Sequence, residues 1–183
     1  PILHSFPTRR SSDLKSTNSK QVYGGYLCAF APVYLGWAFL LGGSMKVGII
    51  MGSKSDLDTM KKASAVLDEF NIPYEMVIAS AHRTPEAVKD FVTRLEGEGA
   101  IAFIAGAGAA AHLPGVVASF TTLPVIGIPL NATALKGIDS LLAIVQMPSG
   151  MPVATMAVDG AKNGALFAVQ IGAAFNKDLK EQY

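Results

Sequence analysis

The segment SAHRTPE, residues 80–86, places a histidine beside an arginine directly after an apolar run. A histidine side chain can give or take a proton near neutral pH, and an arginine can hold a phosphate through two parallel hydrogen bonds. The chain contains three histidines in all, so this pair is informative. We therefore hypothesise that His82 transfers protons and that Arg83 binds an anionic group; an ordinary surface loop is the alternative.

Two further glycine-containing segments carry polar side chains. GSKSD, residues 52–56, comes just before or at a predicted helix start, which suits a phosphate or a ribose near Ser53 and Asp56; the simpler interpretation is an N-cap. AGAGAAAHLPG, residues 105–115, follows another apolar run and carries His112, for which a structural hydrogen bond is the alternative. GSKSD is neither a Walker loop nor a Rossmann fingerprint, and the second segment only faintly resembles the latter.

Composition excludes several other chemistries. From Met45 onward there are 11 Lys and Arg against 13 Asp and Glu, so this part shows no basic surface for nucleic acid. Cys28 is the one cysteine, which rules out an intrachain disulfide and a multi-cysteine zinc site. With two histidines after residue 44 and no spaced carboxylate cluster, we expect no metal site. The single cysteine also fits a reducing, cytoplasmic location.

Strand-like and helix-like segments alternate after Met45. Apolar runs predict strands near 46–52, 74–79, 100–108, 123–130 and 153–157. Apolar residues three or four apart, or small-residue stretches, predict helices near 55–70, 85–96, 110–119, 137–145 and 160–180. Because the strands are continuous apolar runs, a parallel sheet covered on both faces is expected. We predict a flavodoxin-like three-layer α/β/α sandwich, with ligands bound beyond the carboxyl ends of the strands.

Residues 1–44 differ from the rest in composition. A Ser-, Thr-, Arg- and Lys-containing lead precedes residues 26–44, which carry no charge. We interpret 1–44 as a non-native or targeting-like extension without a fold of its own, and 45–183 as a single domain. Membrane attachment is expected only if 26–44 is a genuine anchor, because Pro32 and Gly36 interrupt that run and its length is borderline for spanning.

Taken together, GSKSD, SAHRTP, AGAGAAAHLPG and SLLAIVQMPSGMPVATMAV (140–158) closely resemble the bacterial 5-(carboxyamino)imidazole ribonucleotide mutase family of purine biosynthesis. The resemblance runs from about Lys46 to Lys180. It implies the flavodoxin-like fold, a homo-octamer with sites shared between subunits, and transfer of a carboxylate from an exocyclic nitrogen to carbon 4 of an aminoimidazole. It implies no metal and no organic cofactor.

The resemblance also implies roles for individual residues. Ser53 and Asp56 would bind the ribose-phosphate region, and Ser80 and Arg83 the phosphate. His82 would be the general acid and base. The nucleotide would be wrapped by a glycine-rich turn with His112 beside it, that turn being Gly106, Ala107, Gly108 and Ala109. Independently of the resemblance, the run 145–158 is apolar with two prolines and a glycine, which indicates a segment that covers the site or packs against another subunit.

Two departures from the family pattern are visible. The family usually reads AGAGGAAHLPG, whereas this chain has Ala109 at the third glycine. A methyl group there would crowd the nucleotide, or strain the backbone if φ is positive. The chain also ends at Tyr183, where relatives usually continue into a C-terminal helix that reaches a neighbour, and this bears on octamer formation and site closure.

Two other functions fit parts of the pattern. A related branch carboxylates aminoimidazole ribonucleotide directly with carbon dioxide, but it carries SAHK in place of SAHR and lacks the 105–115 motif, so Arg83 favours the mutase. The second alternative is a non-catalytic nucleotide-binding module, tethered through 26–44. It would bind phosphate-containing ligands without turnover.

Overall fold

A computed structural model of the chain describes residues 45–183; the predicted extension at 1–44 lies outside them. The described residues form one parallel sheet of five strands in the order β2-β1-β3-β4-β5. These strands are β1 (Lys46–Met51), β2 (Tyr74–Ile78), β3 (Ala100–Gly108), β4 (Val125–Leu130) and β5 (Ala154–Thr155). This strand order is the flavodoxin-like one, so the predicted fold class is confirmed.

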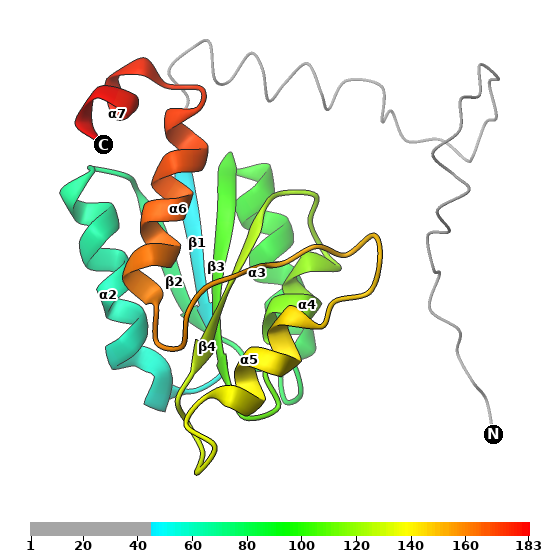
Figure 1. Cartoon of the computed structure of the whole chain (residues 1–183). Helices are drawn as coiled ribbons and strands as arrows, with labels where there is room; N and C mark the ends of the chain where they lie inside the picture. The colour runs from blue at the N-terminus through cyan, green and yellow to red at the C-terminus, as the bar shows by residue number, and fades with distance from the viewer. Residues whose placement is uncertain (1–44) are drawn as a thin grey trace, which may run out of the picture.

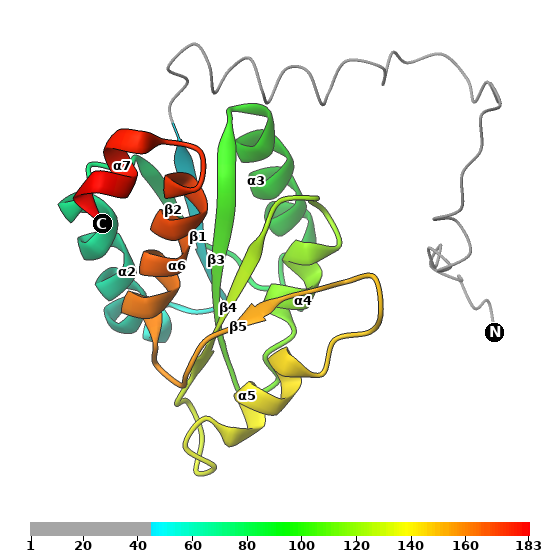
Figure 2. The same ribbon diagram turned by 45° about the horizontal axis from the view of Figure 1, so that its top comes forward.

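Helices cover both faces of the sheet (Figure 1). One layer contains α2 (Leu57–Glu69), α6 (Ala161–Ala173) and α7 (Lys177–Gln182). The other contains α3 (Pro85–Gly97), α4 (Leu113–Ala118) and α5 (Ile138–Val145). Figure 2 shows the short β5 beside β4, after a long connection from α5. The helices lie on two separate buried apolar clusters, one on each side of the sheet, which gives the three predicted layers.

The central strands are apolar throughout because both of their faces are buried. Every residue of β4 is buried, as is β3 from Ala100 to Ala107. Burying a Val, Leu or Ile side chain, on whichever face of the sheet it lies, stabilises the folded state by roughly 1.5–3 kcal/mol. A continuous apolar run of this kind cannot face water, and this is why the sequence pattern identified these strands.

The C-terminal helix differs from its prediction. We predicted one helix near 160–180, but α6 ends at Ala173 and α7 begins at Lys177. Asn176 adopts an extended backbone, and its side chain accepts a hydrogen bond from Leu179 N at 2.9 Å. Asparagine competes for backbone hydrogen bonds and is favoured as an N-cap, so it starts a new helix. Within residues 45–183, no helix is long and apolar enough to cross a membrane.

The strand register brings three loops to one edge of the sheet. Met51 of β1 pairs with Ile78 of β2 and with Gly106 of β3. Ala79 N then donates to Met51 O at 2.9 Å. The segments after these strands therefore start side by side. These segments carry the candidate site residues predicted from the sequence, in 52–56, 80–86 and 105–115.

Candidate active site

Two hydrogen bonds tie the three loops together. Arg83, in the loop after β2, donates from Nη2 to the carbonyl oxygen of Gly52 after β1, at 2.9 Å. His82 lies with its Nε2 2.9 Å from Nδ1 of His112, which follows β3. His82, the predicted proton-transfer residue, thus contacts the loop after β3, whereas Arg83, the predicted anion-binding residue, contacts the loop after β1. The loops converge as the strand order requires, at the switch point between β1 and β3.

The loop after β1 is held by hydroxyl contacts. Ser53 caps the short 3₁₀ helix Lys54–Asp56, accepting from Ser55 N at 3.4 Å, and Ser55 Oγ lies 2.9 Å from Ser53 Oγ. Ser55 Oγ also lies 3.2 Å from Asp56 Oδ1. The N-cap alternative for Ser53 is therefore confirmed. A capping role and a ligand-binding role are compatible, because Ser53 keeps a half-exposed side chain.

Asp56 is the carboxylate nearest this chemistry. Its side chain is half-buried, and burial raises its pKa above the ordinary value of 3.8. The Ser55 hydroxyl, the Ser53 backbone and the positive charge of Arg83 oppose this shift. The carboxylate therefore interacts electrostatically with Arg83. The two side chains do not form one of the salt bridges found within residues 45–183. A partly desolvated carboxylate of this kind suits a hydroxyl donor such as a ribose.

Sequence reasoning missed Thr84, which shapes the second loop. Its hydroxyl oxygen accepts from Ser80 N at 2.9 Å and lies 3.3 Å from Ser80 O. Arg83 N donates to Ser80 Oγ at 3.3 Å. These contacts fold residues 80–84 into a closed turn that presents His82 and Arg83 outward. Thr84 precedes Pro85 at the start of α3, a position typical of side chains that bond the local backbone.

The third loop places its residues at different depths. Gly106 and Ala107 are buried in β3, Gly108 is half-buried, and Ala109 is exposed. A Cβ at Gly106 would collide with the thioether of Met60, a fully buried side chain of α2. Gly106 is thus required by the packing of α2 on β3. The exposed part of this segment, Ala109, Ala110 and His112, is what remains for ligand contact.

Ala109 adopts a left-handed backbone with φ of 53°. This conformation is easy for glycine but costs an L-residue roughly 1–2 kcal/mol. The strain foreseen for this substitution is present. It is held in the tight turn in which Ala111 N donates to Ala109 O and His112 N donates to Ala110 O, both at 2.8 Å.

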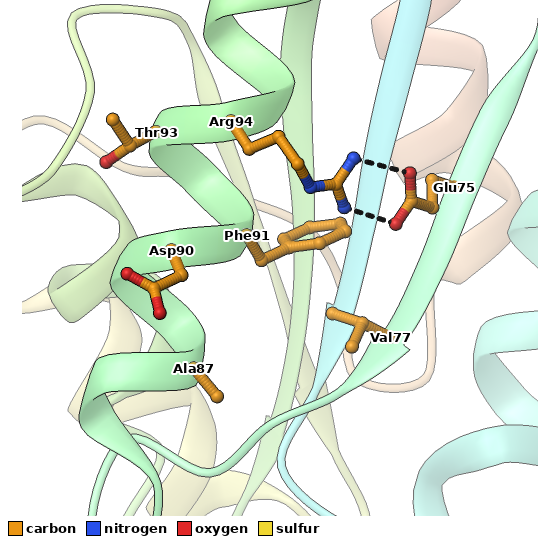
Figure 3. Close-up of a pocket in the computed structure, with 7 residues that line it drawn as sticks. All are labelled: Glu75, Val77, Ala87, Asp90, Phe91, Thr93 and Arg94. Carbon is orange, nitrogen blue, oxygen red and sulfur yellow. Dashed lines mark hydrogen bonds and ion pairs between the residues drawn. The ribbon is translucent and has the colours of Figure 1, made fainter.

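The site is open in the single chain. His82, Arg83, Ala109 and His112 are all exposed. A hollow in the surface lies elsewhere, between α3 and the outer strand β2, where Arg94 pairs with Glu75 over Phe91 (Figure 3). None of the predicted site residues lines it. A second hollow lies beside α7 and is lined by Met45 and Phe70 among others.

Fold and site together define an open α/β protein that presents an imidazole pair and a guanidinium at the switch point of its sheet. In open α/β sheets, ligands bind outside the carboxyl ends of the strands at such a switch point. The AIR carboxylase family model matches residues 46–183. The chain belongs to this family.

Relatives and solved structures agree with this assignment. The N5-carboxyaminoimidazole ribonucleotide mutase of Pyrococcus horikoshii is 57% identical over 136 residues, which cover 74% of this chain and 77% of that protein. The protein of the same name from Bacillus subtilis is 56% identical over 135 residues, covering 73% and 83%. The crystal structure of PurE from Treponema denticola superposes with a TM-score of 0.69 at 31% identity, covering 75% of this chain and 85% of that one.

Replacing Ala109 by glycine should stabilise the protein. Glycine removes the cost of positive φ but adds unfolded-state entropy, so the net gain in the free energy of unfolding is about 1 kcal/mol or less. Ala110 does not have a positive φ, so Ala110→Gly is the matched control and should destabilise. Denaturant unfolding of both variants measures the difference. Equal effects of the two substitutions would contradict the strain at Ala109.

Replacing Asp56 by asparagine should also stabilise the folded protein, in a pH-dependent way. Because burial raises the folded-state pKa, ionised Asp56 costs stability, and this cost develops as the pH rises from the unfolded pKa toward the folded one. Below the unfolded value, near 3.8, wild type and Asp56→Asn should be equally stable. The advantage of the variant should grow as the pH rises from there and then level off. Unfolding measured across this range tests the sign, and an advantage confined to the lowest pH would refute it.

Proposed function

We propose that this protein is the N5-carboxyaminoimidazole ribonucleotide mutase of purine biosynthesis, an isomerase. Relatives of that name share more than half of their aligned residues with this chain. The observation that carries the proposal is the convergence of His82, Arg83 and the Gly52 loop at one edge of the sheet. It brings a proton-transfer group and an anion-binding group within reach of one small nucleotide.

The proposed binding mode uses the first two loops. Arg83 and Ser80 hold the phosphate, and Ser53 and Asp56 hold the ribose-phosphate region. Arg83 keeps one side of its guanidinium on Gly52 O, so its orientation is fixed before the ligand arrives. Binding energy from the phosphate, remote from the reacting atoms, then fixes the imidazole ring. The turn at Gly108 and Ala109 covers the ring side, with His112 beside it.

The proposed chemistry needs one proton delivered and one removed. His82 protonates the exocyclic nitrogen, and the bond from that nitrogen to the carboxylate breaks to release carbon dioxide. Carbon 4 of the ring attacks the carbon dioxide and forms the new carbon–carbon bond. His82 then takes the hydrogen from carbon 4, so protons balance over the cycle. Such proton transfer contributes roughly 10²–10⁴-fold to a rate.

Direct carboxylation by carbon dioxide is the competing activity. Arg83 and the segment AGAGAAAHLPG (105–115) favour the mutase, since the carboxylating branch carries lysine at the arginine position and lacks this segment. The two activities differ in what they consume, because the mutase needs the carbamate nucleotide while the carboxylase needs bicarbonate or carbon dioxide.

The proposed reaction also needs a closed site, and this favours a homo-oligomer. Trapped carbon dioxide escapes unless water is excluded, yet the site residues of one chain are exposed. The α5 helix leaves an apolar face in water, formed by Ile138, Leu142 and Val145, each at least 50% exposed. Their spacing puts them on one side of the helix. We propose that this apolar face packs against another copy of the chain, in an octamer as the family resemblance implies.

The connection after α5 supports the same assembly. Met147 packs closely against Gly115 of α4. A Cβ on Gly115 would lie only 3.2 Å from the thioether of Met147. Pro148, Ser149 and Gly150 stay exposed. This connection therefore continues the α5 apolar face with an extended surface available to a neighbour.

Replacing His82 by asparagine should abolish turnover while nucleotide binding persists. We expect kcat on the carbamate nucleotide to fall by roughly 10²–10⁴-fold, with the dissociation constant changed by less than about threefold, since the phosphate contacts remain. The wild type should convert the carbamate nucleotide without bicarbonate. Turnover that requires bicarbonate would support the carboxylase instead, and binding without any turnover would support the non-catalytic module.

Replacing Leu142 by glutamate should break the proposed assembly. A charge on the α5 apolar face cannot be buried without a large desolvation cost, so the solution mass should fall and activity should fall with it. Lys89→Glu, on the exposed side of α3, is the control and should leave the mass unchanged. Sedimentation and turnover are measured on the same samples. An unchanged mass for Leu142→Glu would remove α5 from the interface.

A further inference from the structure

The contact between His82 and His112 constrains how both residues hold hydrogen. Nε2 of His82 lies 2.9 Å from Nδ1 of His112, and the rings meet nearly at right angles, at 83° with centroids 5.0 Å apart. A nitrogen–nitrogen separation of this size is a hydrogen bond, so one of these two nitrogens carries the shared hydrogen and the other accepts it. Two N–H groups facing each other would push the rings apart.

The outer nitrogens of the pair remain available. Among residues 45–183, no other hydrogen bond is made by the side chain of His82 or by that of His112. Both rings are exposed. Nδ1 of His82 is therefore the nitrogen that can meet a ligand, and Nε2 of His112 is the far end of a continuous chain of two rings.

We infer that His82 and His112 hold the catalytic proton as one unit, in which His112 positions His82 and sets which of its nitrogens carries hydrogen. The inference deepens the proposed mutase function and rests on it. His82 alone would have to be an acid at the first proton transfer and a base at the last. The hydrogen bond to His112 allows that change, because the shared hydrogen can move between two nitrogens that lie 2.9 Å apart.

The hydrogens balance in two states of the pair. In the acid state the pair holds three: one on Nδ1 of His82, the shared one on Nδ1 of His112, and one on Nε2 of His112, with a single positive charge. When His82 gives its Nδ1 hydrogen to the exocyclic nitrogen, the shared hydrogen moves from His112 to Nε2 of His82. The pair is then neutral and holds two hydrogens.

The neutral state is the base that the last step needs. Nδ1 of His82 now has a free lone pair and takes the hydrogen from carbon 4. The shared hydrogen returns to His112, which restores the charge and the starting arrangement. No external acid, base or co-reactant enters the cycle. Neither ring becomes an imidazolate at any point, because Nε2 of His82 receives the shared hydrogen as Nδ1 gives up its own.

Three substitutions of His112 separate the possible roles. In His112→Asn the amide reaches the place of Nδ1, so it can hold the His82 ring in either orientation but cannot release a hydrogen to it and take one back. In His112→Gln the amide reaches the place of Nε2 and leaves His82 without its partner. His112→Leu removes the polar group altogether.

We expect all three variants to lose about 100-fold or more in single-turnover rate, with substrate affinity changed by less than about threefold for His112→Asn. A His112→Asn rate within about threefold of wild type would show that His112 only holds the ring in place, and would overturn the inference. Weakened binding with an unchanged rate would make His112 a ligand contact, and would overturn it as well.

The number of hydrogens in motion gives an independent readout. In mixtures of H₂O and D₂O, the wild-type single-turnover rate should vary with deuterium content along a curve, because two hydrogens move together. For His112→Asn it should vary along a straight line. A straight line for the wild type would overturn the inference even if the His112 variants are slow.

Failure of the proposed function can be told apart from failure of this inference. If the wild type does not convert the carbamate nucleotide, the mutase proposal fails, and the pair is then tested by ¹⁵N NMR of the full chain labelled at its three histidines. Coupling across the hydrogen bond between His82 and His112 should appear in the wild type and vanish in His112→Leu. Absence of that coupling in the wild type would overturn the pairing itself.

Discussion

The parallel register of β1, β2 and β3 is the constraint on which the candidate site depends. Met51 pairs with both Ile78 and Gly106, so three chain segments leave the sheet at the same edge. Parallel strands all end on one side, and helices on both faces return the chain to the other. Without that register, Arg83 would not reach Gly52 and His82 would not reach His112. The strand register of the sheet therefore determines which loops meet at the site.

Residues of the candidate site destabilise the folded state, and burial of apolar side chains against the sheet offsets this cost. Ala109 keeps a left-handed backbone, and burial disfavours the ionised form of Asp56. In the single chain, the imidazoles, the guanidinium and the α5 apolar face are exposed to water. Local strain and unfavourable electrostatics of this kind cluster at functional sites, where the surrounding structure holds them in place. Here the two fully apolar clusters on either side of β3 and β4 supply the offsetting stability.

Much of this arrangement could be predicted from the sequence because it depends on simple patterns. Buried strands are apolar runs, and polar residues after them must meet at one edge. The break between α6 and α7 was missed, since the cap at Asn176 competes with a helical pattern that otherwise continues. Thr84 was missed because its bonds to Ser80 depend on the conformation of a single turn. The contact of His82 with His112 was also out of reach, since it depends on the orientation of two rings that lie 30 positions apart in the chain.

The two outer strands of the sheet affect the tendency of the protein to aggregate. A free strand edge can recruit a strand from another molecule and begin aggregation. On one side β5 has only two residues, too few to serve as a template. On the other side β2 carries Glu75, which Arg94 holds in an ion pair that lowers the pKa of the carboxyl group. A charged side chain on an edge strand opposes the addition of another strand, so each outer strand carries a feature that limits edge-to-edge pairing.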